Sequence, residues 1–301
     1  MLDPRTLYTL DPQVGESVLG TRPPLLHFLD GYIDSGQVAH VAAKYVLEQC
    51  EHEELARFDV DQLHDFRSRR PHFVFDTNHW DNRIDFELVL HKARDAAGKT
   101  FLMLRGPEPD TQWGRAAAAV IGLCREFDVA AVATAYGVPM AVPHTRPTLI
   151  TQHATSPEIV SGNPMWIDSV TVPGSFSHMI EYEAGQAGLL GMGFVAHVPH
   201  YLAQSAFPQA VSTALGRINQ ACGLDIPLEP LRERAKANLD DINSEAASAD
   251  AEFATLLSAL EEQYDRLRES GAASVPSADE IGAAVEQFLA EQDQGGFPAA
   301  N

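Results

Sequence analysis

The feature that most constrains this chain is a regular alternation of short apolar runs with helix-length amphipathic segments, from Leu25 to Gly223. Residues 25–29 are apolar and suit a strand, whereas apolar residues in 37–50 recur every three or four positions, as on one face of a helix. Residues 208–222 repeat the helical pattern after an apolar run, with Gly223 as the C-cap. Strands that alternate with helices predict an α/β fold, a three-layer α/β/α sandwich.

One pair of apolar runs predicts that the central sheet is mixed. Residues 86–90 and 101–104 lie on either side of a polar segment ending in Gly98, which suits a turn that needs positive φ. We expect the two runs to pair as an antiparallel hairpin. Further strands are predicted at 55–60, 72–75, 129–136, 148–154, 167–172 and 193–198, and further helices at 176–190 and at 110–127, the latter capped by Asp110.

The pattern changes at the C-terminal side, where the sequence predicts a helical appendage. Apolar residues recur every three or four positions over 231–267, as in a heptad seam, so we assign residues 1–227 to the sandwich and 228–292 to a helical arm. The arm is either one long helix or a helical hairpin. Its last helix is expected to begin at Ser277, with Glu280 completing a capping box, and the tail 293–301 is expected to be disordered.

Charge and composition exclude several classes of partner. The net charge of −21 and the pI near 4.8 oppose binding to nucleic acid or to an anionic membrane surface. The longest apolar stretch, 187–196, contains three glycines and is too short to span a bilayer, so we expect a cytoplasmic protein. The three cysteines are far apart in sequence and are expected to be reduced packing residues.

Two proline–histidine corners supply the candidate catalytic residues. His144 follows Pro143 and His200 follows Pro199, each directly after a run that suits a buried strand. His144 with Arg146, and His200 with Tyr201, could act as acid–base and anion-binding pairs. The structural alternative is that each histidine holds its corner by a hydrogen bond to the loop.

The segment between the first predicted strand and helix supplies candidate ligand-binding residues. Asp30, Asp34 and Gly36 lie in a loop where backbone N–H groups can converge on a ligand. The two aspartates would repel an anion, so the ligand would be a cation, an amine or a hydroxyl compound. The alternative is that Asp34 or Ser35 simply caps the helix that follows.

Other apparent motifs do not predict a cofactor or a metal. The run 191–196 matches a loose dinucleotide fingerprint but precedes a strand, the reverse of the required order. His197 and His200 would lie on opposite faces of a strand, which makes a zinc site improbable. His178 and Glu181 are one helical turn apart and suit a solvated helix face. We therefore expect no metal and no cofactor.

Several segments, in order along the chain, resemble the PAC2 family in its actinobacterial branch. They are residues 34–36, 105–110 with Trp113, 143–147, 198–202 and 260–265. The resemblance implies a three-layer sandwich similar to phosphorylase/hydrolase-like folds, with a helical C-terminal appendage. The family is named after a proteasome assembly chaperone, and its bacterial members generally lack an assigned activity. Proteasome-binding relatives often end in a hydrophobic-Tyr-any tail, whereas this chain ends Ala299-Ala300-Asn301, so we do not expect docking through the tail.

Two functions follow from the resemblance and the residues. The first is a non-enzymatic assembly or interaction protein that forms a homo-oligomer, with a trimer as the expected state, and binds proteasome subunits or another protein. The second is an enzyme of hydrolase or ligase type with a cleft at the strand ends. Convergence of the candidate residues in one concave site would favour the enzyme, and their separation into independent loop contacts would favour the interaction protein.

Overall fold

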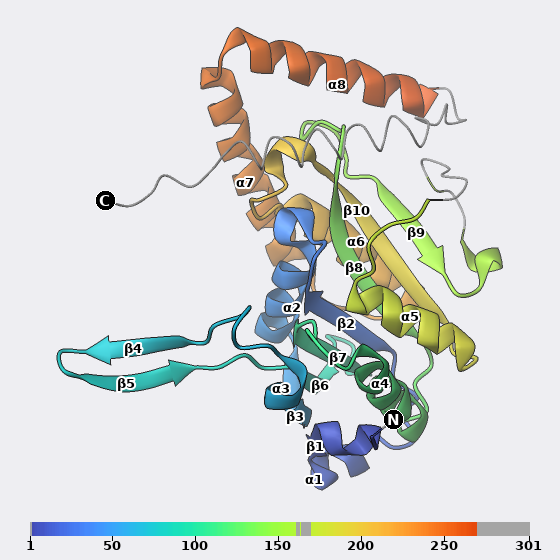
Figure 1. Cartoon of the computed structure of the whole chain (residues 1–301). Helices are drawn as coiled ribbons and strands as arrows, with labels where there is room; N and C mark the ends of the chain where they lie inside the picture. Colours follow the sequence, from blue (N-terminus) through green and yellow to red (C-terminus); the bar gives the residue numbers. More distant parts are fainter. Residues whose placement is uncertain (1, 161–162, 164–169, 270–301) are drawn as a thin grey trace.

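The chain folds as a three-layer α/β/α sandwich with a helical extension. The computed structural model describes residues 2–160, 163 and 170–269. Figure 1 shows the central sheet with helices on both faces, a long two-stranded hairpin that projects from one side, and two C-terminal helices at the end of the sheet. The predicted fold class is confirmed.

The sheet has eight strands in the order β1-β3-β6-β7-β2-β8-β10-β9. Its centre, β7-β2-β8-β10, is parallel, whereas β1, β3, β6 and β9 run antiparallel to their neighbours. The predicted hairpin is the pair β6 and β7, and Gly98 in its turn has φ 81°. The strands are β1 (Tyr8–Leu10), β2 (Leu25–Asp30), β3 (Glu51–Phe58), β6 (Val89–Arg94), β7 (Thr100–Pro107), β8 (Val132–Met140), β9 (Ile150–Ala154) and β10 (Gly191–Pro199).

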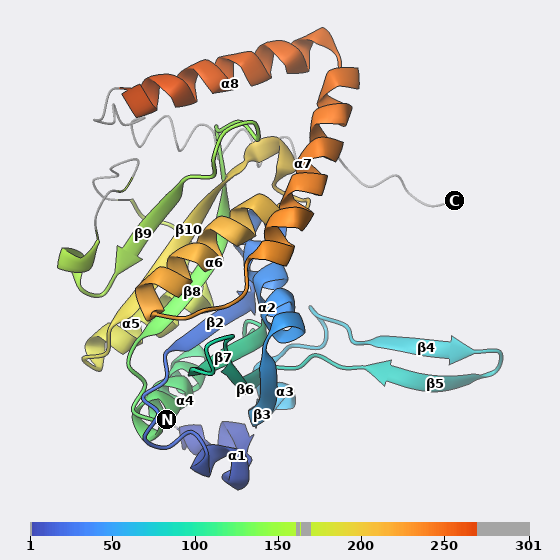
Figure 2. The same ribbon diagram turned by 180° about the vertical axis from the view of Figure 1, so that it is seen from behind.

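Helices cover the two faces of the sheet separately. One face packs against α2, α6 and α7, and the other against α1, α3, α4 and α5 (Figures 1 and 2). Pro208 begins α6 at its first turn and Gly223, with φ 59°, ends it, as the sequence predicts. The helices are α1 (Pro12–Glu16), α2 (Val38–Gln49), α3 (Val60–Leu63), α4 (Trp113–Glu126), α5 (Phe176–Gln186), α6 (Pro208–Cys222), α7 (Glu229–Ser248) and α8 (Ala251–Glu269).

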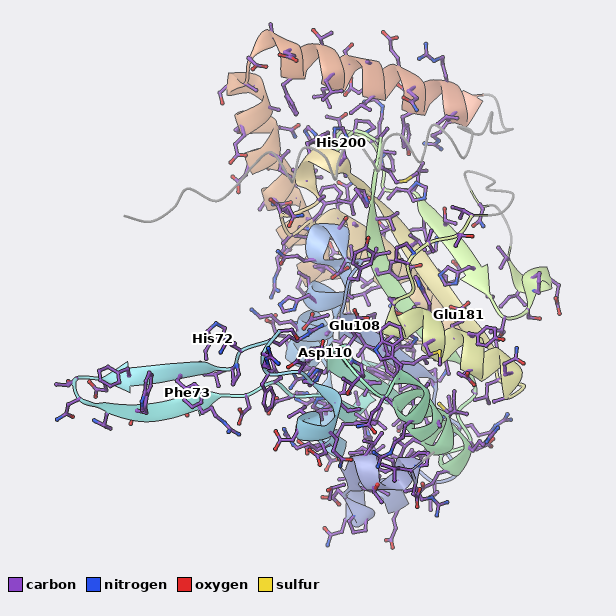
Figure 3. All side chains as sticks on the ribbon, viewed as in Figure 1. His72, Phe73, Glu108, Asp110, Glu181 and His200 are labelled. Carbon is purple, nitrogen blue, oxygen red and sulfur yellow. The ribbon has the colours of Figure 1, made fainter. Side chains whose placement is uncertain are left out.

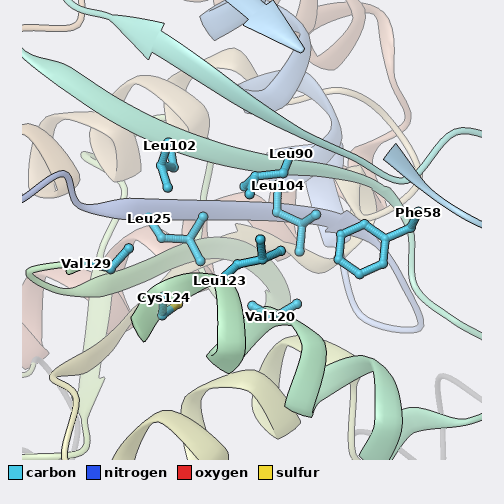
Figure 4. A pocket seen from close by; sticks show the side chains of 9 residues that line it. All are labelled: Leu25, Phe58, Leu90, Leu102, Leu104, Val120, Leu123, Cys124 and Val129. Atoms are coloured by element: carbon cyan, nitrogen blue, oxygen red, sulfur yellow. The ribbon is translucent and has the colours of Figure 1, made fainter. Parts of the chain in front are cut away.

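The core between the sheet and α4 is tightly packed. Leu25, Leu102 and Leu104 from the strands meet Val120 and Leu123 from the helix, as Figure 4 shows. The void left among these side chains measures about 10 Å³ and its lining is apolar. A space of that size with no polar partner is too small to hold an ordered water, so this region stabilises the fold and offers no ligand site.

The strands β4 (His72–Asp76) and β5 (His79–Ile84) form a separate two-stranded hairpin. Figure 3 shows His72 and Phe73 on this hairpin, well away from the sandwich. The sequence predicts the first strand but not the second, because His79–Ile84 is polar and lacks the apolar alternation of a half-buried strand.

The C-terminal arm consists of two helices that meet at Ala249 and Asp250. Leu231 and Ala235 of α7 are buried, and α7 packs along α6. The second helix, α8, crosses the end of the sheet instead of lying back along α7 (Figure 2). The arm is therefore neither a single helix nor a closely packed helical hairpin.

Three details differ from the sequence predictions or lie outside the described residues. Asp110 does not cap α4, because its carboxylate accepts the Asp65 N–H and pairs with Arg69. Gln112 occupies the N-cap position, and the helix begins at Trp113. The strand predicted at 167–172 falls partly outside the described residues, and 170–172 are not in a strand. The helix predicted at 277–292 and the tail lie outside the described residues. Within the described part, no helix is both long and apolar enough to cross a membrane.

Candidate functional site

The four parallel strands β7, β2, β8 and β10 end at one edge of the sheet, and most of the candidate residues lie there. The connecting loops at this edge are 31–37, 141–149 and 200–207, and α8 crosses above them (Figures 1 and 2). Pairing between β2 and β8 stops at His27 and Thr134, while β8 continues to Met140. In open α/β sheets, ligands bind at such an edge, where neighbouring strands diverge.

Asp34 caps the helix α2, which is the structural alternative for this residue. Its carboxylate accepts the N–H groups of Ala39 at 2.9 Å and of His40 at 3.2 Å. It also accepts the N–H of Gly137 on β8 at 3.3 Å. Burial raises the pKa of this carboxyl group, and the three N–H groups counteract that rise. With three backbone partners, Asp34 has little capacity left for a ligand.

The remaining loop candidates also have structural partners. Gly36 adopts φ 71° and packs its Cα against Val198 and Phe207, so a side chain at this position would be strained and crowded. Asp30 lies at the surface and its carboxylate is 2.9 Å from Nδ1 of His40. The loop is thus held by contacts within the chain.

His144 joins three separate segments of the chain. Its side chain is buried, with Nδ1 2.7 Å from the Tyr201 hydroxyl and Nε2 3.3 Å from Oδ1 of Asn243 on α7. The Tyr201 oxygen also accepts the backbone N–H of His144 at 3.0 Å. Because Oδ1 of Asn243 can only accept, the neutral imidazole carries its proton on Nε2, and Tyr201 donates to Nδ1. Burial lowers the pKa of His144 and raises that of Tyr201 to about 12.

Arg146 holds α8 against the strand ends. Its guanidinium lies 2.7 Å from a carboxylate oxygen of Asp265 and 3.2 Å from one of Glu261. Thr145 donates to the same Glu261, and the Tyr264 hydroxyl donates to the Pro147 carbonyl at 2.8 Å. The guanidinium is therefore engaged by two carboxylates of its own chain and is not free to bind an anion.

An open cavity of about 530 Å³ lies beside this corner, between the 144–148 loop, α6 and α7. Arg146, Gln209 and Asn243 contribute polar groups and Leu239 an apolar wall. The side chain oxygen of Thr148 is buried there without a hydrogen-bond partner. Within the described part of the chain, no group of three or more metal-ligating side chains is found.

His200 differs from His144 in having an exposed side chain. It lies beneath α8 at the end of β10 (Figure 3), and its ring makes edge contact with Tyr201 at a centroid distance of 5.3 Å. The six polar candidates thus have separate roles. Asp34 caps a helix, Asp30 contacts His40 at the surface, and His144 with Tyr201 holds a corner. Arg146 binds α8, and His200 is an exposed ring. They do not converge on one point: of the six, only His144 and Arg146 line the open cavity.

The difference between the two histidines gives a direct prediction. His144→Ala should lower the free energy of unfolding by about 1–3 kcal/mol, because it leaves Tyr201 and Asn243 without their partner. His200→Ala should change it by less than about 0.5 kcal/mol, as is usual for an exposed side chain. Urea unfolding of both variants measures the difference. An equally small loss of unfolding free energy in both variants would show that burial and hydrogen bonding at His144 do not stabilise the corner.

A second polar cluster lies between the sheet and α5, and its residues are partly buried. The sequence does not predict it. The Tyr136 hydroxyl on β8 is 3.2 Å from Nε2 of both His153 on β9 and His178 on α5. Nδ1 of His153 is 2.8 Å from Oε1 of Glu181, which Figure 3 shows on α5. The prediction that His178 and Glu181 form a solvated face is wrong, because α5 turns both toward the sheet. Burial lowers the pKa of His178 and raises that of Tyr136.

Two glycines carry the only sequence signal for this cluster. A Cβ on Gly193 would overlap the His153 ring, and a Cβ on Gly191 would press on Glu181. Both glycines lie on β10 and face α5, two residues apart, as alternate residues in a strand do. The run that resembles a dinucleotide fingerprint therefore makes room for a histidine and a glutamate.

Comparison with known proteins identifies the family. The model of the PAC2 family matches residues 28–246. A Mycobacterium tuberculosis protein of unknown function, Rv2714, is 38% identical, with a TM-score of 0.81 over 87% of this chain and 92% of that chain. A Corynebacterium glutamicum protein of unknown function is 34% identical, with a TM-score of 0.79 over 86% and 97%.

A more distant structure shares the fold alone. The M. tuberculosis proteasome-assembly chaperone homologue Rv2125 is 20% identical, with a TM-score of 0.71 over 77% of this chain and 99% of that chain. No curated protein matches at a significant level. The family match covers most of the sandwich and α7, and with the first two relatives it shows that the chain belongs to the PAC2 family.

Proposed function

We propose that this chain is a non-enzymatic, chaperone-like protein that assembles with copies of itself through the β4–β5 hairpin. The observation that carries the proposal is the exposure of large apolar side chains on an element that packs on little else. Phe73, Phe75 and Trp80 are 51%, 56% and 67% exposed, and Ile84 is 56% exposed. The aromatic rings contact one another, with centroids 4.9 Å apart for Phe75 and Trp80.

A hairpin of this kind is unstable on its own. Two isolated strands bury too little surface to offset the entropy of ordering them in water. Exposed aromatic residues in one cluster are typical of protein interfaces, where they provide most of the binding energy. The hairpin is therefore expected to lie on another protein surface in the working assembly.

Charge favours a second copy of the chain as that surface. Residues 66–71, which lead into the hairpin, carry three arginines and no carboxylate, whereas the whole chain has a net charge of −21. A basic segment at the base of the hairpin is attracted to the acidic surface that a second copy of the chain presents. We expect a homo-oligomer with three copies, in the cytoplasm.

The solved relatives suggest what the assembly does. Rv2125, which shares the fold, is described as a proteasome-assembly chaperone homologue. By analogy we propose that the oligomer binds other proteins, with proteasome subunits as one candidate partner. An enzyme with its active site in a cleft at the strand ends has less support, because Asp34, His144 and Arg146 are engaged in separate structural contacts.

Charged substitutions on the hairpin test the proposal. Phe75→Asp with Trp80→Asp should convert the oligomer into a 32.8 kDa monomer, because two carboxylates would be placed in an apolar interface. Tyr182→Ser is the matched control, since Tyr182 is 62% exposed on α5, away from the hairpin. Light scattering during gel filtration reports the mass. An unchanged oligomer in the double variant would rule out the hairpin as the interface.

A further inference from the structure

The hydrogen bonds around His178 fix which of its ring nitrogens carries the proton. The backbone N–H of Ser175 donates to Nδ1 at 3.2 Å, and the Ser175 hydroxyl oxygen accepts the N–H of His178 at 3.3 Å, a capping box at the start of α5. Nδ1 must therefore present a lone pair, and the proton of the neutral ring is on Nε2. Nε2 then donates to the hydroxyl oxygen of Tyr136.

The remaining bonds of the cluster follow from that assignment. With its oxygen accepting from His178, Tyr136 can donate its own proton to Nε2 of His153. Nδ1 of His153 then donates to the Glu181 carboxylate. These hydrogen bonds form a series that runs from Ser175 to Glu181. Each of them has one donor and one acceptor only while His178 is neutral.

The first turn of α5 depends on few other polar contacts. The N–H of Phe176 donates to Oε2 of Glu108 at 2.9 Å, and the other oxygen of Glu108 accepts the N–H of Tyr32 at 3.0 Å. Glu108 thus links the start of α5 to the loop after β2. Phe176 and Ile180 anchor the helix in the core.

We propose that the N-terminal turn of α5 is an acid-sensitive latch, which opens when His178 takes up a proton on Nδ1. The proton occupies the lone pair that receives the Ser175 N–H, so the two donors face each other and the capping box is lost. The imidazolium also lies at the positive end of the helix dipole, where a cation is unfavourable. Release of this turn also loosens the bond to Glu108 and, through it, the loop after β2.

The charges around His178 decide the direction of the response. His153 on β9 and His27 on β2 are the basic neighbours, and Glu181 on α5 and Glu108 after β7 are the acidic ones. His27 is fully buried and neither of its ring nitrogens has a partner. Burial and His153 lower the pKa of His178, outweighing the two carboxylates. The closed latch therefore resists protonation, and the open turn, with its solvated histidine, takes up the proton more readily.

The test uses a substitution that preserves both contacts but cannot titrate. In His178→Gln the side chain oxygen can accept the Ser175 N–H, as in the common Ser-x-x-Gln capping box, and the amide N–H can donate to Tyr136. His200→Gln, at an exposed position after β10 and outside the hairpin, is the matched control. Hydrogen exchange of the peptide spanning α5 is measured from about pH 7 to about pH 5 and corrected for the intrinsic exchange rate.

When the opening of α5 is coupled to the uptake of one proton, the equilibrium constant for opening rises as the pH falls. The rise is up to about tenfold for each pH unit below about 6.5. We expect that rise in the unmodified chain and in His200→Gln, and a flat profile in His178→Gln. The α6 peptide serves to detect global unfolding, which would expose both helices together. A rise that persists in His178→Gln would overturn the proposal.

A second measurement covers the case in which His178→Gln does not fold. ¹⁵N NMR of the unmodified chain should show His178 as the Nε2–H tautomer near neutral pH, and its conversion to imidazolium should coincide with faster exchange in α5. An Nδ1–H tautomer at neutral pH, or protonation without faster exchange, would overturn the latch.

Discussion

Gly137→Ala is expected to lower the free energy of unfolding by about 3–4 kcal/mol. A Cβ at this position would overlap the carbonyl oxygen of Ser35 and touch Val198. Because the obstacle is backbone, no side chain can move aside to make room. The Ser35 loop would have to shift away from β8, which also breaks the bond from the Gly137 N–H to Asp34 and weakens the cap of α2.

Gly122→Ala is the control for this substitution. Gly122 lies inside α4 on its exposed side, and a Cβ there would meet no atom within 4 Å. Alanine stabilises an exposed helix interior by up to about 1 kcal/mol relative to glycine, so this variant should be more stable than the unmodified chain. Urea unfolding compares the two variants. A similar small effect of both would mean that the Ser35 loop does not pack tightly on β8.

Acid is expected to destabilise the protein well before its carboxylates are protonated. Burial lowers the pKa of His27 to about 3 and that of His197 to about 4, whereas both titrate near 6.5 when unfolded. Between those values the unfolded chain binds more protons, so the free energy of unfolding falls as the pH drops from about 6.5 toward 4. At pH 5 each histidine accounts for a loss of about 2 kcal/mol.

His27→Leu isolates one of these contributions. Neither nitrogen of His27 has a partner, so leucine removes the titration without breaking a hydrogen bond. The loss of stability between pH 7 and pH 5 should shrink by about 2 kcal/mol, and His200→Gln, at an exposed position outside the hairpin, should leave it unchanged. Urea unfolding of each variant at pH 7 and at pH 5 measures this pH dependence of stability. An unchanged pH dependence in His27→Leu would mean that His27 is protonated in the folded state or solvated.

The sandwich is readily predicted from the sequence because its signals are local. Gly98 marks the turn between β6 and β7, and Pro208 and Gly223 delimit α6. The second hairpin strand is missed because its side chains face solvent and carry no apolar alternation. The position of α8 depends on contacts between distant residues, such as Tyr264 with Pro147, which no local pattern records.

The candidate site is less predictable for a similar reason. The sequence shows that His144 and His200 follow strand-ending prolines, but not that one is buried among three segments and the other is exposed. Tyr136, His153 and His178 are far apart in sequence and become neighbours only through the order of β8, β9 and α5. Alternate glycines on β10 are the one sequence feature that points to bulky side chains above the strand.

The central claim is that the exposed hairpin joins copies of this chain. Sedimentation velocity of the unmodified chain over a dilution series, with hydrogen exchange of residues 72–84 on the same samples, tests it most directly. We predict a species heavier than the 32.8 kDa monomer at micromolar concentration, with three copies as the expected state, and protection of the hairpin amides that disappears as dilution produces monomer. A monomer at every concentration, or a hairpin that exchanges freely within a stable oligomer, would contradict the account.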